Sequence, residues 1–181
     1  MAQSLFSPPR RARVASDRVE GTLKGGRAIV PQSSGLAEKG YGVVVEEGLE
    51  LTLVEAAYLL DRGELSLTDE GGRSVSLEEL ARRAAALDPG FWVKLNVYTD
   101  LRSRGLRALP LEGVPVLLVE RRSGEGERRY LVLCLEEGVR IGFKELEAFI
   151  RRALESKREP VLAIVDKEGN VSYYTVEKSM G

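Results

Sequence analysis

The chain has 181 residues, 43% of them hydrophobic and 30% charged, with a net charge of −1, a mixture typical of one large or two small soluble globular domains. It contains no histidine, which excludes Ser-His-Asp and Cys-His catalysis and most zinc chemistry. Cys134 is the only cysteine, which excludes an internal disulfide and any multi-cysteine metal site. We therefore expect no metal and no cofactor.

Charge and hydropathy also indicate where the protein acts and how it could attract nucleic acid. No run of about 18 apolar residues occurs, so no membrane span is expected. The first residues lack the apolar run of a secretory signal, so we expect a cytoplasmic protein. Arginine outnumbers lysine by 20 to 7, and its planar fork suits phosphate and carboxylate, although a GC-rich genome produces the same excess. With a net charge of −1, attraction to nucleic acid would have to come from local patches.

The first part of the chain predicts a leader followed by short strands. Residues 1–16 form a polar leader that is expected to be flexible. The alternative is that its cluster of Arg10, Arg11 and Arg13 makes it a basic tail that contacts RNA or a partner protein. Residues 18–30 read as a small hairpin turned at the two glycines 25–26, and residues 43–45 as a further strand.

Three helices are then expected. The segment 50–63 has capping-box spacing between Thr52 and Glu55, and a second box at Ser76 and Glu79 opens a helix over 77–87. A short strand lies between them at residues 65–67. The third helix spans 91–104, with apolar residues at helical spacing before a glycine C-cap. Together these elements predict a small αβ domain over residues 17–105.

A second αβ domain is expected over residues 106–181. Residues 114–120 and 129–135 read as strands whose connection is too long for a tight turn, and residues 142–156 as an amphipathic helix. An apolar run at 161–165, expected to be buried on both faces, and an alternating strand at 171–176 then form a hairpin. The predicted fold class is α+β, with a mixed sheet in the C-terminal domain. The apolar face of the helix comprises Phe143, Leu146, Phe149, Ile150, Ala153 and Leu154.

The terminal hairpin is the expected docking surface. An exposed edge strand is either blunted by charge or pairs with another chain, although an ordinary terminal hairpin of one sheet gives the same pattern. The expected subunit interface is made of the turn residues and the edge strand: Asp166, Lys167, Glu168, Gly169, Asn170, Ser172, Tyr173, Tyr174 and Val176.

Several segments, in this order and spacing, resemble the archaeal tRNA-splicing endonucleases. They are GYG (40–42), LELTLVEAAYLLDRG (49–63), VYTDLRSRG (97–105), RRYLVLC (128–134) and LAIVDKEGNVSYYTV (162–176). The resemblance implies a small N-terminal αβ domain, a nuclease-like C-terminal domain, and metal-independent cleavage of precursor tRNA to a 2′,3′-cyclic phosphate and a 5′-hydroxyl. It also implies a Tyr, His and Lys triad for proton transfer and for stabilising the charged transition state.

This chain departs from the family at the triad. The positions that correspond to the Tyr, the His and the Lys hold Val119, Glu127 and Arg158. The family includes heterotetramers with two catalytic and two structural subunits, and the structural chains lack the triad. The resemblance therefore implies a structural subunit that joins a catalytic paralogue on precursor tRNA in an (αβ)2 assembly. It also implies that the acidic hairpin turn inserts into a polar pocket of a neighbouring subunit and that the last strand pairs across subunits.

Two other classes of function stay open at this point. A stand-alone RNA-binding module would use Arg121, Arg122, Arg128 and Arg129, which flank one hairpin, although solvated strand ends would look the same. An enzyme of another kind would rest on Lys157, Tyr173 or Tyr174. Because adjacent strand residues point to opposite faces, at most one of the two tyrosines can line a given site.

Overall fold

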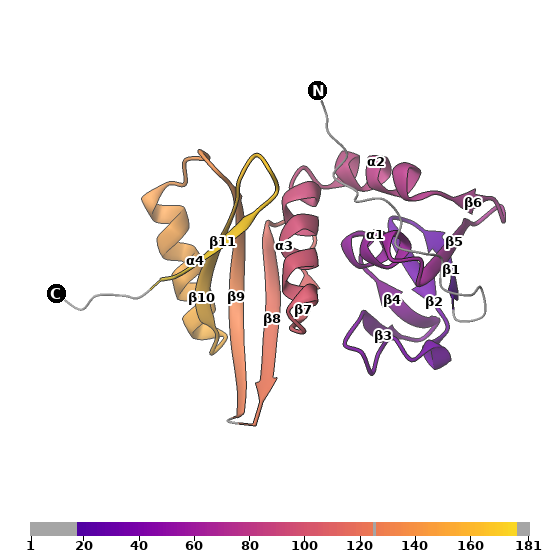
Figure 1. The fold of residues 1–181 in the computed structure, drawn as a ribbon, viewed down its shortest axis with the longest axis horizontal. Coiled ribbons are helices and arrows are strands. Elements are labelled where there is room, and N and C mark those ends of the chain that lie inside the picture. The colour runs from indigo at the N-terminus through magenta and orange to yellow at the C-terminus, as the bar shows by residue number, and fades with distance from the viewer. Residues whose placement is uncertain (1–17, 125, 177–181) are drawn as a thin grey trace.

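The chain forms two αβ units, seen in a computed structural model that describes residues 18–124 and 126–176. One sheet lies on each side of helix α3 (Phe91–Ser103), and helix α4 (Phe143–Glu155) covers the far face of the C-terminal sheet (Figure 1). This arrangement confirms the expected α+β fold class with a mixed C-terminal sheet. The predicted leader over residues 1–16 and its basic cluster lie outside the described residues.

The N-terminal unit is built on a six-stranded sheet in the order β3-β4-β2-β1-β5-β6. The expected hairpin at the two glycines joins β1 to β2, and β1 also pairs in parallel with β5. The sequence reading missed β4, a strand next to the first helix, and β6, which has only two residues. The strands are β1 (Val19–Lys24), β2 (Arg27–Val30), β3 (Val43–Val45), β4 (Gly48–Leu51), β5 (Leu65–Asp69) and β6 (Ser74–Val75).

Helix α1 (Leu53–Asp61) begins later than the sequence suggested. Thr52 is the N-cap and has an extended backbone (φ −65°, ψ 160°), so Glu50 and Leu51 belong to β4 and not to the helix. The predicted capping box is present, because the Thr52 side chain accepts the Glu55 N–H and the Glu55 carboxylate accepts the Thr52 N–H. The helix start is therefore set by local chemistry that the sequence displays.

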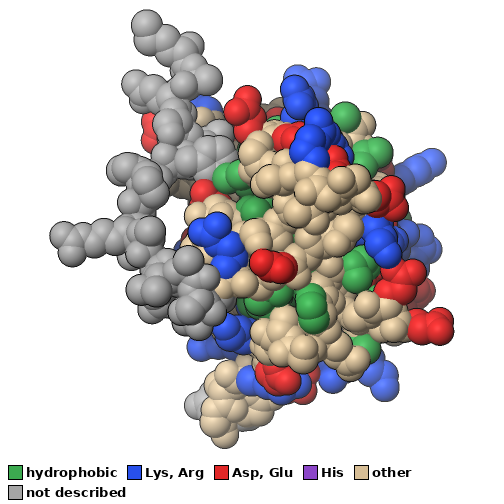
Figure 2. Space-filling view, turned by 90° about the vertical axis from the view of Figure 1, so that its right-hand side faces the viewer, with side chains coloured by type: hydrophobic (Ala, Val, Ile, Leu, Met, Phe, Trp, Pro, Cys, Tyr) green, Lys and Arg blue, Asp and Glu red, His purple; other side chains and the backbone are tan. Residues whose placement is uncertain are grey.

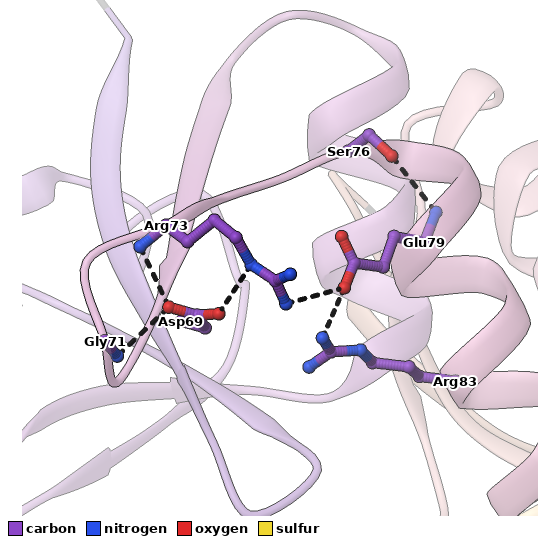
Figure 3. A network of polar contacts seen from close by, with 6 residues as sticks. All are labelled: Asp69, Gly71, Arg73, Ser76, Glu79 and Arg83. Atoms are coloured by element: carbon purple, nitrogen blue, oxygen red, sulfur yellow. Dashed lines mark hydrogen bonds and ion pairs between the residues drawn. The ribbon is translucent and has the colours of Figure 1, made fainter.

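Helix α2 (Leu77–Leu87) has only half of its predicted capping box. The Ser76 hydroxyl accepts the Glu79 N–H, but the Glu79 carboxylate turns to Arg73 and Arg83 instead of the cap backbone (Figure 3). Arg73 also pairs with Asp69, whose carboxylate accepts the N–H groups of Gly71 and Arg73 and so closes the β5–β6 turn. This network ties the turn to the helix that follows it.

Helix α3 is buried on most of its surface because both units pack against it. Its buried residues are Phe91, Val93, Lys94, Leu95, Val97, Tyr98 and Leu101, and all of them except Lys94 belong to one core cluster that runs from the N-terminal sheet to the C-terminal strands. Trp92, placed beside this face by the sequence, is 39% exposed. The predicted domain boundary at residue 105 stays a prediction, and it would assign α3 to the first unit although the helix also contacts β7 to β11.

The C-terminal sheet has five strands in the order β11-β10-β9-β8-β7. Strands β9 and β10 are parallel and the other pairs antiparallel, as a helical crossover between β9 and β10 requires. The short strand β7 was missed by the sequence reading. The strands are β7 (Arg107–Pro110), β8 (Val116–Ser123), β9 (Gly126–Glu136), β10 (Glu159–Val165) and β11 (Val171–Thr175).

The two faces of this sheet are covered by different helices. Leu117, Val119, Val132, Val161 and Ala163 join the core cluster around α3. On the other face, Val116, Leu131 and Leu133 pack against Phe149 and Ala153 of α4 in a separate cluster. Because strand residues alternate between faces, membership of these clusters shows which way each following side chain points.

Two sequence expectations about this unit are wrong, and the predicted amphipathic helix is confirmed with a narrower buried face. The connection of β8 and β9 is tight, because the strands continue through the arginines until Ser123 pairs with Gly126. On α4, Phe143 is 81% exposed and Leu154 is 56% exposed, so the sheet covers only the middle of the predicted apolar face. Leu162 and Ile164 of β10 are half-buried, so this strand is not fully buried on both faces.

Within residues 18–124 and 126–176, no helix is both long enough and apolar enough to cross a membrane.

Candidate functional site

The structure separates the three triad positions. Val119 lies in the middle of β8, pairs with Tyr130 of β9, and is 1% exposed on the α3 face of the sheet. Glu127 and Arg158 lie on the opposite, α4 side, where both line one hollow of about 330 Å³. The structure therefore brings the second and third positions together and leaves the first in the core.

The hollow lies where β10 begins and where β8 and β9 run on beyond the rest of the sheet (Figure 1). Its wall contains four basic and two acidic residues besides one apolar side chain. The Glu127 carboxylate is 3.1 Å from the Arg129 guanidinium and so is already paired. The lining residues are Glu127, Arg128, Arg129, Leu154, Lys157, Arg158 and Glu159.

Arg158 is placed by the end of helix α4. The Lys157 N–H donates to the Leu154 carbonyl and the Arg158 N–H to the Ala153 carbonyl, with Lys157 in the left-handed region (φ 54°). This is the Schellman ending of a helix, in which glycine is the usual left-handed residue. The local backbone thus turns Arg158 back under the sheet, where only 14% of its side chain is exposed.

The Arg158 guanidinium is poorly partnered. Its Nη2 lies 3.9 Å from the Glu120 carboxylate, beyond hydrogen-bond distance, and its buried Nη1 has no hydrogen-bond partner among the described residues. The sequence reading did not single out Glu120. The signal that could have found it is strand alternation, because Val119 faces the α3 core and the next side chain must point to the α4 side of the sheet.

At Arg158 this arrangement offers a positive charge but no exchangeable proton. An arginine stays charged at any physiological pH and cannot exchange a proton, so it can only bind or stabilise an anion. Lys157 is exposed at the rim of the hollow. Among the described residues, no group of three or more His, Cys, Asp or Glu side chains is placed to hold a metal ion.

The four arginines proposed for RNA contact lie on the projecting end of the β8–β9 hairpin. Arg121 pairs with Arg128 across the strands, while Arg122 faces Glu127 and Arg129 faces Glu120. All four are exposed. On the α4 face of this hairpin, each arginine therefore lies opposite a glutamate. On the other face, Arg121 and Arg128 lie opposite each other, and their repulsion is unfavourable unless an anion lies between them.

The turn of the terminal hairpin is held by its own first residue. The Asp166 carboxylate accepts the Glu168 and Asn170 N–H groups and the Asn170 side-chain amide. The Asn170 side chain is the largest cause that lowers the pKa of Asp166 below its usual value. Gly169 supplies the left-handed backbone (φ 85°). Lys167 and Glu168 are exposed, so they are the charges that the turn presents outward.

Strand β11 shows one tyrosine to the core and one to solvent. The Tyr173 hydroxyl donates to the Asp100 carboxylate of α3 at 2.7 Å, and burial raises the pKa of Tyr173. Tyr174 is 55% exposed on the opposite face, and Ser172 is exposed. Val176 extends the pairing, since its N–H donates to the Pro160 carbonyl. Among the described residues, β11 pairs only with β10, so its outer edge is open.

A second hollow, of about 510 Å³, lies between the two units and was not foreseen. Lys94 of α3 is 1% exposed beside it, forms an ion pair with Asp88, and donates to the Leu111 carbonyl at 2.7 Å. Arg27 reaches the same wall, where it pairs with Glu50 and Glu112. The face of the N-terminal unit shown in Figure 2 carries basic and acidic side chains interspersed, with small separate hydrophobic groups.

Comparison with known proteins agrees with this organisation. Residues 19–81 match the N-terminal domain of the tRNA intron endonuclease, and residues 91–173 match its catalytic C-terminal domain. The second match begins with α3.

The chain is also similar to whole proteins from archaea. It is 39% identical to the tRNA-splicing endonuclease of Thermococcus kodakarensis over 146 residues, which cover 80% of this chain and 86% of that protein. It is 36% identical to the tRNA-splicing endonuclease of Methanococcus maripaludis, over 79% of this chain and 82% of that protein. The protein of the same name from Pyrococcus abyssi is 34% identical, over 77% and 81%. This chain therefore belongs to the tRNA intron endonuclease family.

Proposed function

We propose that this chain is the structural, non-catalytic subunit of a tRNA-splicing endonuclease and that it assembles with a catalytic paralogue to excise introns from precursor tRNA. The observation that carries the proposal is the composition of the hollow beside β8, β9 and β10. It contains Glu127 and Arg158 where the family resemblance implies His and Lys, and the whole chain has no histidine. A chain so composed lacks the group that would protonate the leaving 5′-oxygen.

The position of the missing tyrosine does not alter this conclusion. The resemblance implies Val119, which is buried on the α3 face, whereas the next residue of β8, Glu120, lies on the α4 side, 3.9 Å from Arg158. We propose Glu120 as the structural counterpart of the tyrosine. Neither a valine nor a carboxylate paired with Arg158 replaces a phenol that activates a 2′-hydroxyl.

The proposed partner is a histidine-containing paralogue in an (αβ)2 heterotetramer. Two features of the terminal hairpin support an assembly role: the internally braced turn with exposed Lys167 and Glu168, and the open edge of β11 with exposed Tyr174. A rigid turn presents its charges in a fixed register, which favours partner choice over raw affinity. An open edge strand is a ready template for pairing with another chain.

The proposal is tested by cleavage of an intron-containing precursor tRNA. We expect no cleavage by this chain alone, and restored cleavage to a 2′,3′-cyclic phosphate and a 5′-hydroxyl when the histidine-containing paralogue from the same organism is added. Robust cutting by the purified chain alone would remove the proposal.

A matched pair of variants checks that restoration depends on the terminal hairpin. Glu168→Lys reverses a charge on the turn, whereas Glu155→Lys reverses an exposed charge on α4. We expect co-purification with the paralogue to be lost for the first variant and kept for the second. Equal behaviour of the two would contradict the assigned interface.

An RNA-binding module that acts without a nuclease partner is the second candidate. The like-charge rung of Arg121 and Arg128 favours it, because a phosphate between the two guanidinium groups would relieve their repulsion. Filter binding of RNA separates the candidates. Affinity of the lone chain equal to that of the assembly, with a steep fall as salt rises, would favour the binding module.

A further inference from the structure

Strand β11 is held to the rest of the molecule by few contacts. It is the outermost strand of its sheet and pairs only with β10 among the described residues. All five of its residues are half-buried or exposed, and of these Val171 and Tyr173 pack against the core around α3. A strand with so little burial gains little from the hydrophobic effect and is expected to open more readily than the inner strands. An interface built on its edge therefore needs a further contact that holds the strand in place.

That contact comes from helix α3. The Tyr173 hydroxyl donates to the Asp100 carboxylate at 2.7 Å, and within residues 18–124 and 126–176 this is the only side-chain hydrogen bond between β11 and another element. Burial, and after it the bond to Asp100, raises the pKa of Tyr173, so the phenol keeps its proton and donates it at neutral pH. A hydrogen bond to a charged acceptor is roughly twice as strong as one between neutral groups.

The Asp100 carboxylate is itself held in place. Arg104, the C-cap residue of α3, contacts both carboxylate oxygens, at 2.8 Å and 3.2 Å. The Arg104 guanidinium also lies 5.5 Å from the centre of the Tyr173 ring. Because a guanidinium that contacts both oxygens fixes the orientation of a carboxylate, the helix and not the strand sets the direction of this acceptor.

The same end of α3 is fastened to the N-terminal unit. The Arg102 guanidinium donates to the Lys39 carbonyl at 3.0 Å and lies 3.8 Å from the centre of the Tyr41 ring. Arg102 therefore holds the GYG segment, while Asp100 holds β11 from the same end of the helix. Three of the segments that carry the family resemblance, namely residues 40–42, 97–105 and 162–176, meet here.

We infer that Asp100 is a positioning residue for assembly: through the Tyr173 hydroxyl it fixes β11 in the register at which its open edge receives the partner chain. A strand that is already ordered and in register loses less conformational entropy when another strand pairs with it. Asp100 therefore raises the affinity for the partner without contacting it. That the partner is the catalytic paralogue rests on the proposed function, whereas the fixing of β11 does not.

Two variants break this bond from its two ends: Asp100→Ala removes the acceptor and Tyr173→Phe the donor. Calorimetric titration with the histidine-containing paralogue should show an affinity about tenfold lower for each, as expected if β11 is then correctly placed about one tenth of the time. The double variant should lose no more than either single variant, because both changes break one bond. Additive losses, or affinities equal to that of the unaltered chain, would overturn the inference.

Asp69→Ala is the matched control for a general loss of stability. Asp69, at the end of β5, also pairs with the arginine four positions further on, Arg73, just as Asp100 pairs with Arg104. Its carboxylate accepts two backbone N–H groups as well, so its removal should cost at least as much stability. The control should bind the paralogue as the unaltered chain does. A loss of affinity equal to that of Asp100→Ala would contradict the positioning role.

Hydrogen exchange of the lone chain separates this inference from the proposed function. The backbone amides of β11 should exchange about tenfold faster in Asp100→Ala and in Tyr173→Phe, and at the unaltered rate in Asp69→Ala. If the unaltered chain does not bind the paralogue, the proposed function fails, and the exchange rates still decide whether Asp100 fixes β11. Unchanged exchange in Asp100→Ala would overturn the inference even where the assembly forms.

Discussion

The N-terminus of α1 and the end of α4 each bury an ionisable side chain, but they treat it in opposite ways. Glu55 is fully buried, and its carboxylate accepts hydrogen bonds from the Gly42 N–H, the Thr52 N–H and the Thr52 hydroxyl at 2.8–3.0 Å. Arg158 has one carboxylate at 3.9 Å and a buried nitrogen without a partner among the described residues. The comparison teaches that a fully partnered buried charge holds the fold, whereas a poorly partnered one contributes little to it.

The role of Glu55 explains one of the segments that carry the family resemblance. Burial is the largest influence on Glu55 and raises the pKa of its carboxyl above the usual 4.5, although its hydrogen bonds oppose this shift. Its bond to Gly42 fastens the GYG segment to α1. Gly42 has φ 64°, and a Cβ there would lie 2.6 Å from the Glu50 carbonyl oxygen, so only glycine suits this position.

The largest loss of stability is expected for Glu55→Ala, which tests whether Glu55 holds the fold as the comparison with Arg158 implies. The substitution leaves the Gly42 and Thr52 N–H groups buried without an acceptor, so the free energy of unfolding should fall by about 3 kcal/mol. Urea denaturation measures this loss. Glu78→Ala, an exposed glutamate in the first turn of α2, is the control and should cost about 0.5 kcal/mol or less. Similar losses in both variants would erase the distinction drawn for Glu55.

A smaller effect is expected for the stability of Arg158→Gln. Because its single ion pair is long, its loss should change the free energy of unfolding by less than about 1 kcal/mol. Urea denaturation of this variant beside Arg151→Gln, which removes an exposed arginine of α4, gives the measurement. A loss as large as that of Glu55→Ala would show that Arg158 is a structural residue and would break the comparison.

The smallest effect concerns the hairpin turn and pH. The pKa of Asp166 is lowered in the folded chain, so its contribution to stability is present above the usual pKa of 3.8 and is lost as pH falls through the lower folded value. Asp166→Asn should therefore be less stable than the unaltered chain at neutral pH, and the difference should shrink as the pH is lowered below about 4. Thermal unfolding at several pH values tests this, and a difference that grows with acidity would contradict it.

Most of the fold could be predicted because its signals are local. The Thr52–Glu55 capping box, the Ser76 cap, the Gly25–Gly26 turn and the apolar spacing of α3 each act within a few residues, and each appears in the structure at or near the expected place. The misses are β4, β6 and β7, strands of two to four residues. Such strands have too few residues to show a period, and they exist because a neighbouring strand provides hydrogen bonds.

The candidate site was less accessible to sequence reasoning. Glu127 and Arg158 are 31 positions apart, and only the parallel pairing of β9 with β10 brings them to one hollow. Val119 was selected by its place in a pattern, but the alternation of β8 turns it into the core and turns Glu120 outward. Lys94, charged yet 1% exposed, gave no sequence signal, since its burial depends on Asp88 and on the Leu111 carbonyl.

By itself, the sequence determined the helix caps, the α+β class, the family resemblance and the absence of histidine, because these depend on residue identity and short-range spacing. The tertiary structure alone decided which side chains share the hollow, which tyrosine of β11 meets Asp100, and which buried charge is left without sufficient partners. The physical reason is that strand pairing joins segments that are far apart in the sequence. In addition, neighbouring residues of a strand point to opposite faces, so a shift of one position moves a side chain from the core to the solvent.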